Sequence, residues 1–176
     1  MPSPFRYLNV LLPVIAILWL SPLYGQAAFL TEIQQKWANA GDYTREVALL
    51  LPAEKYGFQP TPDQMSFGAQ LGHLASNILW LSSAYLGGPQ AAPKAAELPT
   101  DKDSLLQLLE TALQQGARVL AQIQPEALEE KVDFFAGNFS RRQIIHLMQD
   151  HLTHHRAQMI VYLRLQGITP PKYRGW

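Results

Sequence analysis

Apolar residues recur at steps of three and four along most of this chain, which is the spacing of one buried face of an α-helix. The first such segment covers residues 29–51, and Pro52 ends it. Its apolar positions are Phe29, Leu30, Ile33, Trp37, Ala40, Tyr43, Val47 and Leu50. This pattern predicts a long amphipathic helix.

Two more helices are predicted in the middle of the chain. One begins after the loop of residues 55–62, with Thr61-Pro62-Asp63 or Ser66 as its cap, and runs to about Leu86, where Gly87-Gly88-Pro89 stops it. After a Pro- and Ala-rich connection, the other helix covers about residues 100–123. Its apolar stripe contains no ionisable residue, so we expect a structural role for it.

The fourth helix is predicted to begin at Ser140, where Ser140 and Gln143 fit a capping box, and to end before Gly167. The preceding residues 132–138 resemble a short extended piece that turns at a glycine. Four helices of about twenty residues each predict an all-α fold, a four-helix bundle in a single domain of residues 28–176.

The N-terminal residues 1–27 are predicted to be a signal peptide. Arg6 precedes an apolar run at residues 8–20, and Gly25-Gln26-Ala27 offers small residues for cleavage after Ala27. The run is shorter than the ~20 residues that span a bilayer, so a retained membrane anchor is the weaker alternative. We therefore expect an exported, soluble protein of the periplasm or cell envelope.

Composition narrows the chemistry. The 14 basic and 14 acidic residues balance, so no electrostatic surface for nucleic acid is expected. The chain has no cysteine, which excludes disulfides, thiolate metal ligands and a nucleophilic thiol of its own. Any metal must be held by nitrogen and oxygen ligands, and any thiol chemistry needs a thiol from the substrate.

Two histidines carry the strongest chemical signal. His151 and His155 stand four residues apart on the fourth helix, so their side chains project from one face about 6 Å apart, as in helical histidine pairs that bind zinc. A pair is incomplete, and the only histidine outside this helix is His73. If His73 comes from a facing helix, three imidazoles converge on one divalent metal ion.

The neighbouring polar residues have simpler interpretations. His146 lies about 140° around the helix from His151 and cannot join the site, and His154 fits a surface position. A guanidinium has no lone pair for a metal, so Arg156 is interpreted as a salt-bridged or snorkelling side chain. Asn77, one turn after His73, and Gln158 are candidates for contacts to a ligand or to the substrate.

The same residues resemble a known family. The segment 151–158, followed by Val161-Tyr162-Leu163-Arg164, Gly167 and Pro170-Pro171, is similar to the C-terminal signature of the DinB/YfiT-like proteins. The segments 60–62, 66–68 and 71–73 are similar to the second-helix region of that family. Ala157 stands where the family pattern usually has glycine, which affects helix packing rather than a ligand.

The resemblance implies a four-helix bundle that binds a divalent metal ion, Zn²⁺ or Ni²⁺ before others, through His73, His151 and His155. Characterised members are thiol-dependent transferases and isomerases, so it also implies a small-molecule substrate and a thiol. Usual members are cytoplasmic, where small thiols are abundant, whereas this chain begins with an export signal.

Three functions stay open at this point. The chain is a metal-dependent transferase or hydrolase, or a non-catalytic exported binding or stress protein. Alternatively, its histidines only fill the core through hydrogen bonds. No residue stands out as a general base, so the catalytic residues are unknown, and a homodimer is left open.

Overall fold

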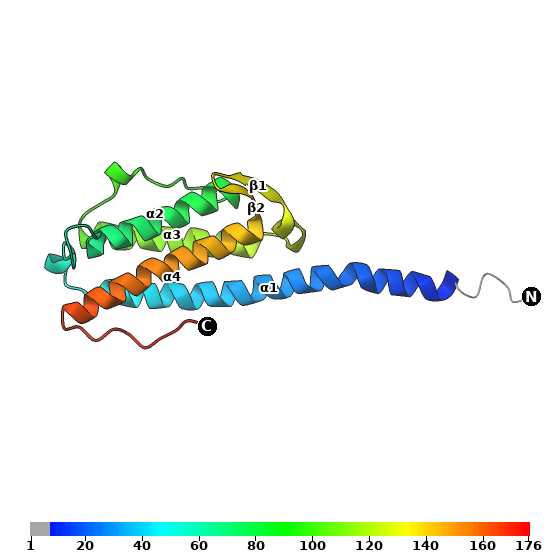
Figure 1. Cartoon of the computed structure of the whole chain (residues 1–176), viewed down its shortest axis with the longest axis horizontal. Coiled ribbons are helices and arrows are strands. Elements are labelled where there is room, and N and C mark those ends of the chain that lie inside the picture. The colour runs from blue at the N-terminus through cyan, green and yellow to red at the C-terminus, as the bar shows by residue number, and fades with distance from the viewer. Residues whose placement is uncertain (1–7) are drawn as a thin grey trace, which may run out of the picture.

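The computed structural model describes the backbone of residues 8–176 and the side chains of residues 25–176. Its helices are α1 (Leu8–Leu50), α2 (Phe67–Tyr85), α3 (Lys102–Gln122) and α4 (Arg141–Leu165). The predicted all-α four-helix bundle is confirmed (Figure 1). The predicted signal peptide lies almost wholly outside the described side chains and stays a prediction.

Short elements connect the helices. The short extended piece predicted before α4 is one part of an antiparallel hairpin of two strands, β1 (Lys131–Phe134) and β2 (Gly137–Ser140). Three short 3₁₀-helices lie in the connections: η2 (Ala53–Lys55), η3 (Ala95–Glu97) and η4 (Pro125–Glu129). Within the described residues, no helix has both the length and the apolar character needed to span a membrane.

The helices begin where side chains can satisfy their first backbone N–H groups. The hydroxyl of Ser66 accepts a hydrogen bond from the backbone N–H of Ala69 at the start of α2, and Asp101 does the same for Ser104 at α3. Ser140 and Gln143 form the predicted capping box of α4. α1 begins earlier than the predicted Phe29, because Gln26, Ala27 and Ala28 favour a helix and the single Gly25 does not stop it.

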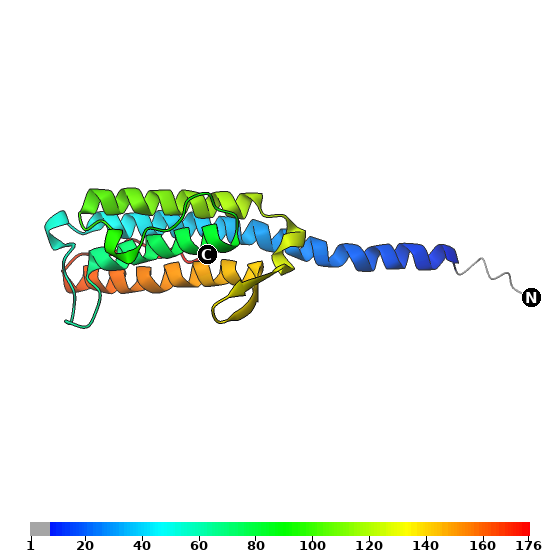
Figure 2. The same ribbon diagram turned by 90° about the horizontal axis from the view of Figure 1, so that it is seen from above.

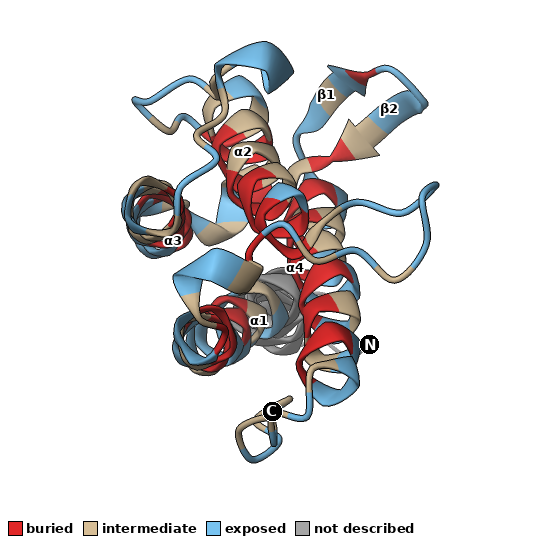
Figure 3. Cartoon of the chain, turned by 90° about the vertical axis from the view of Figure 1, so that its left-hand side faces the viewer, coloured by how far each residue is buried: buried red, intermediate tan, exposed pale blue. Residues whose placement is uncertain are grey.

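The four helices enclose one apolar core (Figure 3). α2 packs against α3 and α4, and α1 packs against α3 and α4 on the opposite side. α2 and α4 run in opposite directions, whereas α2 and α3 run in the same direction (Figures 1 and 2). This arrangement sets the α2–α4 contact that carries the site.

Parallel neighbours explain the long connection at residues 86–101. The chain leaves the C-terminal end of α2 and must travel back along the helix before α3 can begin (Figure 1). On the way, the carbonyl of Pro93 accepts a hydrogen bond from the Ser76 hydroxyl, which holds the connection against α2. This connection forms one wall of a cavity described below.

Candidate metal centre

The structure brings His73, His151 and His155 together between α2 and α4. His151 Nε2 lies 3.2 Å from His73 Nε2 and 3.2 Å from His155 Nε2. One nitrogen from each ring lies within 4.8 Å of the other two. The predicted convergence of the three side chains is therefore observed.

Helix direction and phase produce this arrangement. His151 and His155 are one turn apart on α4, so both rings face α2. His73 lies in the second turn of α2, at the level where the antiparallel α4 passes it. His155 is buried, and the other two histidines are half-buried.

The spacing of the nitrogens fits a tetrahedral metal ion. Two nitrogen ligands at the usual Zn–N bond length are about 3.3 Å apart when the angle at the metal is tetrahedral. Without an ion, the lone pairs of two such close nitrogens repel each other unless one nitrogen carries a proton and donates it to the other. The donor set therefore suits a metal, and three protein ligands leave a further position for a substrate or water.

Gln70 fixes the ring of His155. Its side chain is 2% exposed, and its Oε1 lies 2.5 Å from His155 Nδ1. An amide oxygen only accepts, so Nδ1 carries the proton and the lone pair of Nε2 points toward the other histidines. Gln70 was not singled out from the sequence, although a glutamine among the buried positions Phe67, Leu71 and Leu74 is a signal that could have found it.

The amide of Gln70 is held in turn by other side chains. Its Nε2 donates to Gln158 Oε1 at 2.7 Å and to the Tyr162 hydroxyl at 3.4 Å. Gln158 Nε2 then donates to His154 Nε2 at 2.8 Å. The predicted involvement of Gln158 therefore takes the form of support for Gln70, one step behind the imidazoles.

Electrostatics keep the three imidazoles neutral. Burial, with a smaller contribution from the neighbouring histidines, lowers the pKa of His151 to about 4 and that of His155 to about 3. Burial also lowers the pKa of His73 below its ordinary value. Near neutral pH the rings are therefore uncharged, and their lone pairs are free for a metal.

The other candidates are placed as follows. His146 is exposed on another face, where its ring packs on Phe29, and His154 is exposed as expected. Asn77 Oδ1 and His151 Nδ1 are both buried without a hydrogen-bond partner among the described residues. Asn77 is thus an unused acceptor one turn from His73, and its contact to a ligand stays a prediction.

The interpretation of Arg156 as a salt-bridged or snorkelling side chain was wrong. Its side chain is buried, and its guanidinium lies 4.8 Å from the centre of the Tyr43 ring. It donates to the Ala40 carbonyl, the Thr44 hydroxyl and the Thr153 hydroxyl, and no carboxylate of the described residues forms an ion pair with it. Arg156 therefore ties α4 to α1 on the face opposite α2, because neutral acceptors and an aromatic ring satisfy its charge.

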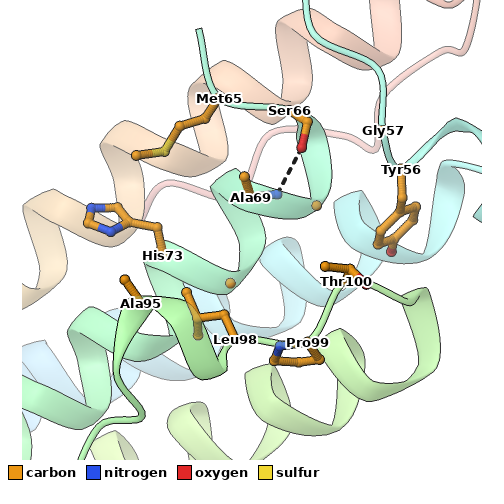
Figure 4. A pocket seen from close by; sticks show the side chains of 12 residues that line it. Tyr56, Gly57, Met65, Ser66, Ala69, His73, Ala95, Leu98, Pro99 and Thr100 are labelled. Carbon is orange, nitrogen blue, oxygen red and sulfur yellow. Dashed lines mark hydrogen bonds between the residues drawn. The ribbon is translucent and has the colours of Figure 1, made fainter.

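A cavity of about 490 Å³ begins at His73 and follows the first turns of α2 (Figure 4). Its opposite wall is the 86–101 connection, through Ala95, Leu98, Pro99 and Thr100. His73 is the residue that the cavity shares with the cluster of imidazoles.

Comparisons with protein families, curated proteins and solved structures agree on one family. The model of the DinB family matches residues 25–175. Among curated proteins, the uncharacterized protein YjoA of Bacillus subtilis (strain 168) is 23% identical over 141 residues, which cover 78% of this chain and 91% of YjoA.

Two solved structures share the fold. A DinB-like protein from Bacillus cereus ATCC 10987 superposes with a TM-score of 0.72 at 21% identity, covering 80% of this chain and 95% of the other. The DinB-like protein YjoA from Bacillus subtilis gives a TM-score of 0.68 at 24% identity, covering 81% of this chain and 97% of the other. At these identities the likeness concerns the fold alone.

We predict that Gln70→Leu weakens binding of Zn²⁺ by about 10- to 100-fold, because His155 loses the acceptor that fixes its ring and tautomer. Competition with a zinc indicator measures the affinity. Gln115→Leu is the matched control, since Gln115 is a buried glutamine of α3 that bonds Ser82 and Gln90 away from the histidines. Equal affinities in the two variants would contradict the role of Gln70.

The pKa shifts predict that the metal-free protein loses stability on mild acidification. A histidine with a folded-state pKa below its unfolded value of about 6.5 binds fewer protons when folded. Its stabilising contribution is present above pH 6.5 and is lost as the pH falls toward 4. Melting temperatures between pH 7 and pH 5 should fall more steeply for the native chain than for His151→Leu, and parallel curves would rule out the shift of His151.

Proposed function

The chain belongs to the DinB family, and from that premise we propose that it binds one divalent metal ion through His73, His151 and His155 and uses it in a transfer or hydrolysis reaction. The ion that we propose is Zn²⁺ or Ni²⁺. The substrate is a small molecule, and the attacking group is a thiol or water. The protein works outside the cytoplasm if residues 1–27 act as a signal.

One observation carries the metal proposal: Nε2 of His151 lies 3.2 Å from Nε2 of His73, on the facing helix, and 3.2 Å from Nε2 of His155. Imidazole is a preferred ligand of Zn²⁺ and Ni²⁺, whereas Mg²⁺ and Ca²⁺ prefer oxygen. Among the described residues, the group consists of three histidines and includes no carboxylate. The chemistry of the donors therefore supports a transition-metal ion rather than a hard cation.

Reaction chemistry follows from the number of ligands. Three histidines resemble a catalytic zinc site, which keeps one position open, rather than a structural site, which closes all four. When bound, a divalent ion in this position lowers the pKa of a thiol or water molecule and so supplies a nucleophile near neutral pH. The three imidazoles hold this centre, and Gln70 keeps His155 in the correct tautomer.

Proton transfer is not assigned to any side chain. The nearest additional imidazole, His154, is exposed and accepts a hydrogen bond from Gln158. No Asp or Glu belongs to the group of ligand atoms found among the described residues. A substrate that arrives with its own acidic proton, such as a thiol, suits a site of this kind.

We expect the purified native protein to contain about one metal ion per chain, and His73→Ala and His151→Ala to lose most of it. Elemental analysis measures the content. His146→Ala is the control, because His146 lies on the same helix but outside the cluster. The metal should also raise the melting temperature, since it binds only the folded chain.

Equal metal content in the native protein and in all three variants would contradict the proposed metal site. An unchanged melting temperature after chelation would favour the alternative in which the histidines fill the core through hydrogen bonds alone.

We also expect thiol-transfer or hydrolytic activity to depend on the metal. A screen with a low-molecular-weight thiol and an electrophilic acceptor should show turnover that chelation and His151→Ala abolish and that His146→Ala leaves intact. Turnover that survives chelation would argue against metal catalysis. A protein that binds metal yet shows no turnover with any acceptor would favour the non-catalytic binding protein.

A further inference from the structure

The cavity beside His73 has a distinct chemical character. None of the residues that line it is Asp, Glu, Lys or Arg. Its surface is made largely of aliphatic groups from Met65, Ala69, Ala95, Leu98 and Pro99 (Figure 4). A charged group placed there would lose its hydration without gaining a partner.

Most polar groups at its edge already have partners. The Ser66 hydroxyl accepts from the backbone N–H of Ala69, as the dashed line in Figure 4 shows. The Tyr56 hydroxyl donates to the Ala48 carbonyl, and burial raises the pKa of Tyr56, so that end carries no charge. The lining therefore offers few free hydrogen-bonding groups to a ligand.

Small residues on α2 make the room. Gly68, Ala69 and Gly72 follow one another on this side of the helix. A Cβ atom at Gly72 would lie 3.2 Å from Leu105 and 3.7 Å from Leu98, so glycine lets α3 and the 86–101 connection approach α2 closely. A cavity of about 150 Å³ already holds benzene, and this one is several times larger.

An exposed methionine lies at the rim. Met65 is 44% exposed, and it lines the same cavity as His73 (Figure 4). Its backbone carbonyl accepts from the Tyr162 hydroxyl, so the segment is anchored while the flexible side chain faces the opening. Methionine adapts its shape to varied apolar ligands.

We propose that this cavity binds the uncharged, apolar part of the substrate, an alkyl or aryl group, and places the reactive end of that molecule at His73. The proposal rests on the proposed function, because it takes the imidazole cluster as the place of reaction. It gives the substrate a class: a neutral molecule with a hydrophobic tail or ring. Peptide-like thiols that carry several carboxylates do not suit this cavity.

A series of straight-chain thiols tests the cavity and the metal separately. We expect the zinc-loaded protein to bind ethanethiol, butanethiol and hexanethiol with affinity that rises up to about fourfold per added methylene, the ratio that corresponds to about 0.8 kcal/mol of buried methylene. Calorimetry measures the affinities. 6-Mercaptohexanoate, which has a carboxylate at the far end, should bind at least tenfold more weakly than hexanethiol.

Variants of residues that line the cavity test whether the rise of affinity with chain length comes from binding there. Ala69 is exposed and lines it, so Ala69→Phe and the smaller Ala69→Leu fill it without entering the core. Both should flatten the dependence of affinity on chain length. Ala84→Phe is the matched control, an exposed alanine of α2 that does not line the cavity. Melting curves confirm that each variant is folded.

The outcomes are distinguishable. If zinc and ethanethiol bind but affinity does not rise with chain length, or if 6-mercaptohexanoate binds as well as hexanethiol, the cavity proposal is overturned and the metal proposal stands. If zinc does not bind, the proposed function fails, and the metal-free protein still reports on the cavity. In NMR spectra of the metal-free protein, n-hexanol should shift the methyl resonances of Ala69 and Ala95. Unshifted resonances would overturn the cavity proposal.

Discussion

Three imidazoles that share one small space between α2 and α4 constrain the rest of this structure. Nε2 of His151 lies 3.2 Å from Nε2 of each of the other two, and burial disfavours the protonated rings that could relieve the repulsion between lone pairs. Neutral rings this close together avoid that repulsion when one nitrogen donates a proton to the lone pair of the other, or when a metal ion accepts the lone pairs. The metal ion proposed above would accept all three lone pairs at once.

The surrounding side chains serve this arrangement. Gln70 fixes the proton of His155, Gln158 and Tyr162 hold Gln70, and the Met65 carbonyl holds Tyr162. On the other face of α4, Arg156 ties that helix to α1 through neutral acceptors. The long connection between α2 and α3 exists because these helices run parallel, and its return path forms a wall of the apolar cavity beside His73.

Local signals made the fold predictable. The steps of three and four, the caps at Ser66 and Ser140 and the glycine at 167 gave the helices to within a few residues, except for the start of α1. The pair His151 and His155 followed from helical spacing, but His73 needed the family resemblance, because spacing says nothing about which helix faces which. The contacts of Gln70 and Arg156 could not be predicted for the same reason, because their partners lie 85 and 116 residues away in the chain.

The central claim is that the three Nε2 atoms bind one ion. Diffraction from crystals of the zinc-loaded protein, recorded at the zinc absorption edge, tests it most directly. The account predicts one anomalous peak per chain, about 2.1 Å from Nε2 of His73, His151 and His155. A peak bound elsewhere, or none between α2 and α4 in a protein that is saturated with zinc, would contradict it.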